Sequence, residues 1–256
     1  MNLKEYLKRA EKEKWAIGQF NFYNSKQLKA IVETAIKLKS PVILGTSERQ
    51  SKIVGLKNLI VQVAEYKVKY GHPIFLHLDH GRSFEYIRRA IDAGYDSIHF
   101  DGSHLPLKEN IEITKKVVSY AKKKNLPIEA EIEAVGNADK KNGAITEPKK
   151  VAEFIKKTKG IDTLAVTIGN VHGIAASGIN PKLNLQKLKK IKKAAGKIPL
   201  VLHGGSGIRP SDIKGAVKSG IAKVNIATEI KKAKTILKIK KTVENKINLF
   251  QSQNKI

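Results

Sequence analysis

The sequence predicts one (β/α)8 barrel over residues 1–256. Short apolar runs recur eight times, each ends in a polar or Gly-containing turn, and a charged stretch with helical spacing follows each turn. Strands that alternate with helices pair in parallel, and eight such units close into a barrel. An open doubly wound sheet is the alternative, but no Gly-x-Gly-x-x-Gly follows the first apolar run.

The apolar runs that we expect to be strands are, in order, residues 16–22, 41–47, 74–79, 97–101, 128–134, 163–169, 199–203 and 223–227. Helix signals lie between them: Asn24 or Ser25 is a typical N-cap, and the helix that begins at Ser211 ends before Gly220. The polar segment 136–148 follows the fifth run. In a barrel it lies on the catalytic face, so we expect a mobile loop there.

The chain carries a formal net charge of +26, which comes mainly from lysines scattered over the expected helices. Such a balance can attract nucleic acid or anionic surfaces. Nucleic-acid binders usually concentrate arginine with aromatic residues, and only 6% of these residues are aromatic. We therefore expect solvated helix faces, with nucleic-acid binding weak and nonspecific if present. A non-catalytic basic barrel that binds nucleic acid is the alternative of another class.

The chain contains no cysteine, which excludes disulfides, thiolate metal ligands and a cysteine nucleophile. No apolar run reaches the roughly 18 residues of a membrane-spanning helix. Residues 1–7 predict an amphipathic helix and not a signal peptide. The expected location is the cytoplasm.

Function in such barrels resides at the carboxyl ends of the strands. Each expected strand ends in polar residues, which are Asn21, Ser47, Asp79, His80, Asp101, Ser103, Glu131, Glu133, Asn170, His172, His203, Ser206, Asn225 and Thr228.

Three of these residues, His80, His172 and His203, predict a metal site. Imidazole is the commonest protein metal ligand, and three of them leave one position of a tetrahedral ion open for substrate. Ligation by histidine without thiolate suits Zn²⁺, with other divalent ions possible. Glu131 and Asp101 are candidates for outer or alternate ligands, and a purely structural role is the other interpretation.

Asp79 directly precedes His80. A carboxyl group there can exchange a proton with a substrate held on the metal. The alternative is an aspartate that caps the next helix or binds the turn.

The turn from Gly204 to Gly207 and the segment from Asn225 to Thr228 follow the last two expected strands. Phosphate sites of barrels often form there, from backbone N–H groups and a helix N-terminus. Glycine permits close approach of the backbone, and Ser206 and Thr228 add hydroxyl donors.

Together these residues resemble the class II, metal-dependent fructose-bisphosphate aldolase family. The matching segments cover nearly the whole chain, in the order Phe20-Asn21, Leu78-Asp79-His80-Gly81, Phe100-Asp101-Gly102-Ser103-His104, Glu129-Ala130-Glu131, Gly169-Asn170-Val171-His172-Gly173, Leu202-His203-Gly204-Gly205-Ser206-Gly207 and Val224-Asn225-Ile226-Ala227-Thr228.

The resemblance implies cleavage of fructose 1,6-bisphosphate to dihydroxyacetone phosphate and glyceraldehyde 3-phosphate. It implies that His80, His172 and His203 bind one Zn²⁺ and that Asp79 exchanges a proton. The positions implied to hold the ketose phosphate are Gly173, Gly204, Ser206, Asn225 and Thr228, with Asn21 and Ser47 nearby. Glu131 and Asp101 match positions associated with a second or displaced metal. Asp139 is the nearest candidate for the acid in the loop after strand five, and a homodimer or homotetramer is implied.

The chain departs from the family pattern at three places. Gly136-Asn137 stands where the family usually has Gly-Gly, and no lysine follows Gly173 closely. The C-terminal helical region looks shortened, and with it an arginine that helps bind the far phosphate is missing.

Three other enzymes remain as alternatives. Tagatose 1,6-bisphosphate or another ketose bisphosphate is the substrate alternative. A metal-free sugar-phosphate isomerase would leave the three histidines without a role. A Schiff-base aldolase needs a lysine at a strand end, and Lys223 instead lies at the beginning of its expected strand.

Overall fold

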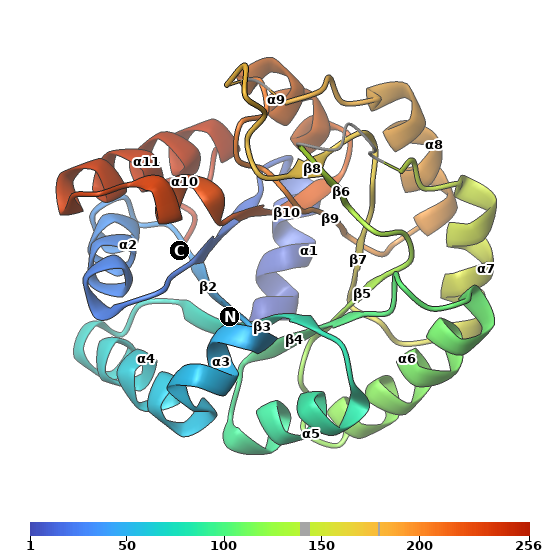
Figure 1. Cartoon of the computed structure of the whole chain (residues 1–256), viewed down its shortest axis with the longest axis horizontal. Coiled ribbons are helices and arrows are strands. Elements are labelled where there is room, and N and C mark those ends of the chain that lie inside the picture. The colour runs from blue at the N-terminus through green and yellow to red at the C-terminus, as the bar shows by residue number, and fades with distance from the viewer. Residues whose placement is uncertain (139–143, 179) are drawn as a thin grey trace.

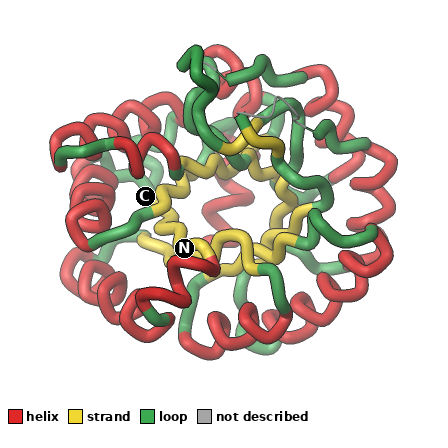
Figure 2. Tube along the Cα trace, in the orientation of Figure 1, coloured by secondary structure: helices red, strands yellow, loops and turns green. Residues whose placement is uncertain are grey.

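The structure, a computed structural model, describes residues 1–138, 144–178 and 180–256. Its centre is a closed barrel of eight parallel strands with helices around the outside (Figures 1 and 2). The barrel strands are β1 (Ile17–Asn21), β2 (Val42–Ser47), β3 (Ile74–Gly81), β4 (Ser97–Asp101), β5 (Ile128–Glu131), β7 (Thr163–Ala165), β9 (Leu200–Leu202) and β10 (Ile221–Ile226).

All eight expected strands are present, so the predicted (β/α)8 barrel is confirmed. The barrel closes because β1 pairs with both β2 and β10, with Gln19 opposite Asn225 in the second pair. The open doubly wound sheet is therefore excluded. The outer helices are α2 (Ser25–Lys37), α3 (Glu48–Val54), α4 (Leu56–Tyr70), α5 (Phe84–Ala93), α6 (Leu107–Lys122), α7 (Pro148–Thr158), α8 (Leu185–Ala195), α9 (Pro210–Lys218), α10 (Thr228–Lys232) and α11 (Ile236–Phe250).

Strand β10 begins at Ile221, earlier than predicted, so Lys223 lies within the strand and not at its beginning. The largest differences from the predicted bounds are at β5 and β7, which end early in the barrel. The chain leaves the barrel after each of them and forms a separate two-stranded parallel sheet from β6 (Gly136–Asn137) and β8 (Val171–His172). The base of the segment 136–148 thus pairs with the strand that carries one of the predicted metal ligands.

Helix α1 (Leu3–Glu13) covers the amino end of the barrel, and Figure 1 shows it at the centre of the view, behind the ring of strands. Its buried residues Leu3, Tyr6 and Leu7 pack with Trp15 and Ile43 in a small separate core. The main core lies between the sheet and the outer helices. None of the helices in the described ranges is both long and apolar enough to cross a membrane.

The barrel interior above α1 is polar, although most residues of the barrel strands are buried. Alternate residues of a strand face the same side, and here the inward positions carry Gln19, His77, Ser97, Glu129, Thr163 and Lys223, all buried. Two residues further along each strand the same faces reach the carboxyl end, where the candidate site lies.

Candidate metal centre

Most of the predicted site residues meet in one cavity of about 180 Å³ at the carboxyl end of the barrel. Its walls are Asn21, Asp79, His80, His172, Gly173, His203, Gly204, Ser206, Asn225, Ala227 and Thr228. All of these belong to the polar strand ends and motif segments that the sequence indicated.

Two of the three predicted ligands face each other. Nε2 of His80 lies 3.1 Å from Nδ1 of His203. Two nitrogens bound at about 2.05 Å to one tetrahedral zinc ion lie roughly 3.3 Å apart. The pair therefore has the separation of two ligands of one ion, or of two rings that share one proton.

The other nitrogen of each ring is held by a buried carboxylate. Nδ1 of His80 is 2.8 Å from Asp101 Oδ2, and Nε2 of His203 is 2.7 Å from Glu129 Oε1. A carboxylate accepts from an N–H, so we assign the proton to these two nitrogens. This is the outer-shell arrangement that fixes the tautomer of metal-binding histidines.

His80 has an unusual backbone conformation, with φ at 52°. Histidine is among the few non-glycine residues that adopt this left-handed region. The peptide N–H of His80 donates to Nδ1 of His99 at 3.2 Å. This contact holds the turn that brings the His80 ring toward His203.

His172 lies at the edge of the cavity. Its ring centre is 5.2 Å from that of His80 and 6.3 Å from that of His203, and its side chain is exposed. Among the described residues, ligand atoms within 4.8 Å of one another come from Asp79, His80, His99 and His203, and His172 is outside that group. The structure therefore places His172 beside His80 and His203, but its ring nitrogens lie outside the group of ligand atoms that are close enough together to share one ion.

A second group of possible ligands consists of His80, Asp101 and Glu131. Oε2 of Glu131 is fully buried and lacks a hydrogen bond, as does Nε2 of His99, although the two atoms are 3.2 Å apart. A buried carboxylate oxygen without a partner is costly. A divalent cation beside His80 would satisfy it, so the donors present fit a metal ion.

Asp79 is held by two amides. Nδ2 of Asn21 donates to its Oδ2 at 2.8 Å, and Nδ2 of Asn225 donates to its Oδ1 at 3.2 Å. Burial raises the pKa of Asp79, but the nearby rings of His80 and His203 outweigh burial and hold it well below its usual value. Asp79 is therefore an ionised acceptor aimed into the cavity.

The histidines differ in charge when no metal is bound. Burial lowers the pKa of His80, but Asp79 and the hydrogen bond to Asp101 more than offset it and raise the pKa to about 10. Although His172 is exposed at the cavity edge, the protein groups around its ring partly desolvate it, and this desolvation together with the neighbouring His80 lowers its pKa to about 4. Burial also lowers the pKa of His203, and the hydrogen bond to Glu129, which acts in the opposite direction, only partly offsets this effect. At neutral pH the proton of the facing pair thus resides on His80.

The predicted phosphate-binding segments approach each other closely. Gly204 has φ at 64°, and a Cβ there would lie 2.2 Å from the carbonyl oxygen of Val171. Only glycine fits this contact. Two donors of the turn are already used, because the N–H of Gly205 donates to the carbonyl oxygen of Asn225 and the N–H of Gly207 donates to Glu229.

Asn180 joins two of these segments and was missed by the sequence reasoning. Its buried Nδ2 donates to the carbonyl oxygens of Gly173 at 2.9 Å and Ser206 at 2.8 Å, and its Oδ1 accepts from the N–H of Ala175. One side chain therefore fixes the spacing between the turn after His172 and the turn after His203.

Ser47 does not line this cavity, although it pairs with Asp79 in the sheet. It caps α3 and, with Glu48, Arg49, Lys52, Ile53, His80 and Arg82, lines a second hollow of about 610 Å³. His80 belongs to both spaces, so this hollow begins where the first cavity ends. Lys52 and the peptide N–H of Arg82 both bind Glu48.

Asp139, the remaining predicted residue, lies outside the described residues. The described base of its loop reaches the site, since the N–H of Ala138 donates to the carbonyl oxygen of His172 at 2.9 Å.

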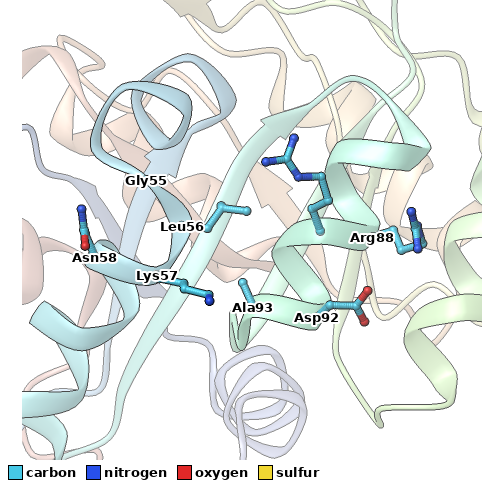
Figure 3. A pocket seen from close by; sticks show the side chains of 8 residues that line it. Gly55, Leu56, Lys57, Asn58, Arg88, Asp92 and Ala93 are labelled. Carbon is cyan, nitrogen blue, oxygen red and sulfur yellow. The ribbon is translucent and has the colours of Figure 1, made fainter.

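A further hollow of about 540 Å³ lies between α4 and α5, lined by residues 55–58, Arg88, Arg89, Asp92 and Ala93 (Figure 3). It is larger than the cavity at His80, but it contains no histidine. Its one carboxylate, Asp92, accepts from Tyr120. The chemistry, not the size, therefore selects the cavity at His80.

The sequence reasoning also missed Glu129 as the residue that orients His203, and did not include His99 among the candidate site residues. Both lie one or two positions before a predicted site residue on the same inward face. The signal was the two-residue alternation of polar side chains within buried strands, as in His99/Asp101 and Glu129/Glu131. Glu129 and His99 precede the strand ends, where the predicted site residues lie.

The fold and the cavity define the class: a (β/α)8 barrel with histidines and carboxylates gathered at its carboxyl end, as in metal-dependent barrel enzymes. Comparison with known proteins then makes the class specific. Residues 1–255 match the family model described as fructose-bisphosphate aldolase class-II. This chain belongs to the class II fructose-bisphosphate aldolase family, so it is a metal-dependent aldolase, and the resemblance seen in the sequence is confirmed.

Individual relatives agree with that assignment. A fructose-bisphosphate aldolase of Staphylococcus epidermidis is 37% identical over 285 positions, which cover 100% of this chain and 98% of the relative. One from Geobacillus stearothermophilus is 41% identical over 236 positions, covering 90% and 81%. The 285 aligned positions exceed the 256 residues of this chain, so the first relative has segments that this chain lacks.

A solved structure of similar fold is the YdjI aldolase of Escherichia coli K12, with a TM-score of 0.85 and 31% identity over 100% of this chain and 98% of that one. A putative fructose-1,6-biphosphate aldolase of Coccidioides immitis has a TM-score of 0.89 and 26% identity, covering 99% and 97%.

Proposed function

We propose that this protein cleaves fructose 1,6-bisphosphate to dihydroxyacetone phosphate and glyceraldehyde 3-phosphate, with one catalytic Zn²⁺. The observation that carries the proposal is the facing pair of His80 and His203 nitrogens, 3.1 Å apart, beside the ionised Asp79. The relatives named fructose-bisphosphate aldolase support the choice of substrate.

His80, His203 and His172 are the proposed ligands, and His172 reaches the ion by a rotation of its exposed side chain. When bound, the ion supplies a Lewis acid that polarises the ketose carbonyl group. Glu131 and Asp101, which share His80 with this site, are proposed to hold a second or displaced metal.

Asp79 is the proposed acid/base. Its carboxylate accepts the proton of the C4 hydroxyl group as the C3–C4 bond breaks and the aldehyde forms. Asn21 and Asn225 keep the two oxygens of Asp79 in place, because each donates to a different oxygen. Asp139 is proposed to exchange the C1 proton of dihydroxyacetone phosphate.

The ketose phosphate is proposed to bind at Gly173, Gly204, Ser206 and Thr228, with Asn225 beside it, on one side of His80. The second phosphate would then bind on the other side of His80. Ser47, Arg49 and Arg82 line the hollow there, and the sequence indicated no arginine for this role in the C-terminal region. Cationic side chains of the β2 and β3 turns are thus proposed to replace it.

Cleavage assays test the proposal directly. Purified protein is assayed with fructose 1,6-bisphosphate and, in parallel, with tagatose 1,6-bisphosphate, before and after treatment with EDTA and after return of Zn²⁺. We expect cleavage activity to be lost after EDTA treatment and to return when Zn²⁺ is added back. Fructose 1,6-bisphosphate should be cleaved faster than tagatose 1,6-bisphosphate. Activity that resists EDTA would refute the metal centre. Preference for the tagatose sugar would replace the proposed substrate.

A further inference from the structure

Lys223 is a lysine buried inside the barrel. It lies on β10, two residues before Asn225, and 1% of its surface is exposed. It does not line the cavity at His80. A buried ammonium group is costly unless it is paired and hydrogen-bonded, so its partners indicate what it does.

The ammonium group contacts two side chains. Nζ lies 2.6 Å from Oε2 of Glu129 and 3.5 Å from Nε2 of His77. An ammonium group can only donate, so we assign Nε2 of His77 as an acceptor and the ring proton to Nδ1, which donates to the hydroxyl of Ser97 at 2.7 Å. Lys223 is therefore fixed from two sides, and its strongest contact is a charge-assisted bond to Glu129.

The second oxygen of Glu129 continues the chain of contacts. Oε1 lies 2.7 Å from Nε2 of His203, whose Nδ1 faces His80. Three strands are linked in this way: Lys223 from β10, Glu129 from β5, and His203 immediately after β9. Glu129 is itself 2% exposed, so solvent does not compete for either oxygen.

We propose that Lys223 is a positioning residue of the metal centre: by holding Oε2 of Glu129, it aims Oε1 at Nε2 of His203, which leaves Nδ1 of His203 free to bind the metal. The inference rests on the proposed metal centre and goes beyond it, since it assigns a role to a lysine that touches neither metal nor substrate. It also gives Lys223 a role other than that of a Schiff-base lysine.

Substitution of Glu129 gives a test in which structural and positioning roles predict different results. In Glu129→Gln, Lys223 binds the amide oxygen and turns the NH₂ group toward His203. Nε2 of His203 must then accept, the ring proton moves to Nδ1, and metal binding weakens. In Glu129→Gln with Lys223→Met, the amide is free to turn its oxygen back to Nε2. Removal of the lysine should therefore restore the metal site.

The experiment measures zinc affinity of the full chain by competition with a chelating dye, without any sugar. We expect Glu129→Gln to weaken affinity about 10- to 100-fold, and the double variant to recover at least tenfold. Lys223→Met alone should weaken it about tenfold. Lys67→Met is the matched control, because it removes an ion pair with Asp96 outside the barrel interior, and should leave affinity within about threefold. The Nε2–H resonance of His203 in zinc-loaded protein should be strongly shifted downfield in the wild type and lose that shift in Lys223→Met.

Recovery in the double variant would support the inference even if Lys223→Met did not fold, since the double variant replaces the buried charged pair by neutral side chains. A double variant that binds zinc no better than Glu129→Gln would overturn it. A wild-type protein that binds zinc but cleaves neither sugar would refute the proposed function and leave this inference standing.

Discussion

Nε2 of His80 and Nδ1 of His203 lie 3.1 Å apart, and the remaining nitrogen of each ring is bound to a buried carboxylate. The two nitrogens that face each other, Nε2 of His80 and Nδ1 of His203, can form a hydrogen bond only if one of them carries a proton. Without metal they share the proton of His80, and with metal that proton has to leave. Binding of the proposed metal to this pair would therefore release that proton.

Zinc affinity should consequently depend on pH. Because the pKa of metal-free His80 is raised to about 10, His80 is protonated at neutral pH and must lose that proton to bind. Affinity should rise about tenfold per pH unit between pH 6.5 and 8.5 and level off only near the pKa. Chelator competition at several pH values, or calorimetry in buffers of different ionisation enthalpy, measures this. An affinity that is flat over that range would contradict the assigned charge of His80.

Replacement of Asp79 by Asn should remove the acid/base while the site can still be filled with metal. We expect kcat for cleavage to fall by about 10²- to 10⁴-fold, with one zinc per chain still bound when zinc is in excess. Steady-state kinetics and metal analysis of the same preparation test this. Asp92→Asn is the control, because Asp92 binds Tyr120 outside the cavity. Near-normal kcat in Asp79→Asn would assign Asp79 to a structural role.

Replacement of Arg49 and Arg82 by Ala should affect only ligands with a second phosphate. Loss of a charge-assisted contact at an exposed site predicts a rise in KM for fructose 1,6-bisphosphate of about tenfold. Exchange of the C1 proton of dihydroxyacetone phosphate should be unchanged, since that compound has one phosphate. Arg88→Ala, in the hollow of Figure 3, is the matched control. If the substitutions impaired the cleavage of fructose 1,6-bisphosphate and the proton exchange of dihydroxyacetone phosphate equally, the second phosphate would have to bind elsewhere.

Replacement of Asn180 should disturb the ketose phosphate site from a distance. In Asn180→Ala the carbonyl groups of Gly173 and Ser206 lose their shared donor, at a cost of about 1–3 kcal/mol. We expect the thermal midpoint to fall by a few degrees and KM for dihydroxyacetone phosphate in the exchange assay to rise. Asn180→Asp keeps the acceptor for Ala175 but adds a negative charge, so its KM should rise further. Normal KM values with a lower midpoint would make Asn180 a structural residue only.

The fold was predictable because every strand carries its own signal. All eight apolar runs became barrel strands, and the largest errors in their bounds are at the ends of β5 and β7, where the chain leaves to form β6 and β8. That departure depends on a pairing between residues 136–137 and 171–172, and neither segment shows on its own that it will pair with the other.

The site was predictable where it lies at strand ends and less so elsewhere. His80, His203 and Asp79 meet because a parallel barrel brings all strand ends to one face. Glu129 and Lys223 lie deeper, and their alternation pattern was available in the sequence. Asn180 is different: its partners are 7 and 26 residues away across loops, and such contacts follow from tertiary structure and not from any local pattern.

The separate sheet of β6 and β8 divides the metal centre into two mechanical parts. His80 and His203 are anchored to the barrel wall, whereas His172 belongs to a narrow ribbon whose partner strand is the base of the segment 136–148. Two of the three proposed ligands are therefore supported by the barrel, and the third by the ribbon. A change in the pairing of residues 136–137 with residues 171–172 would shift the position of His172 alone.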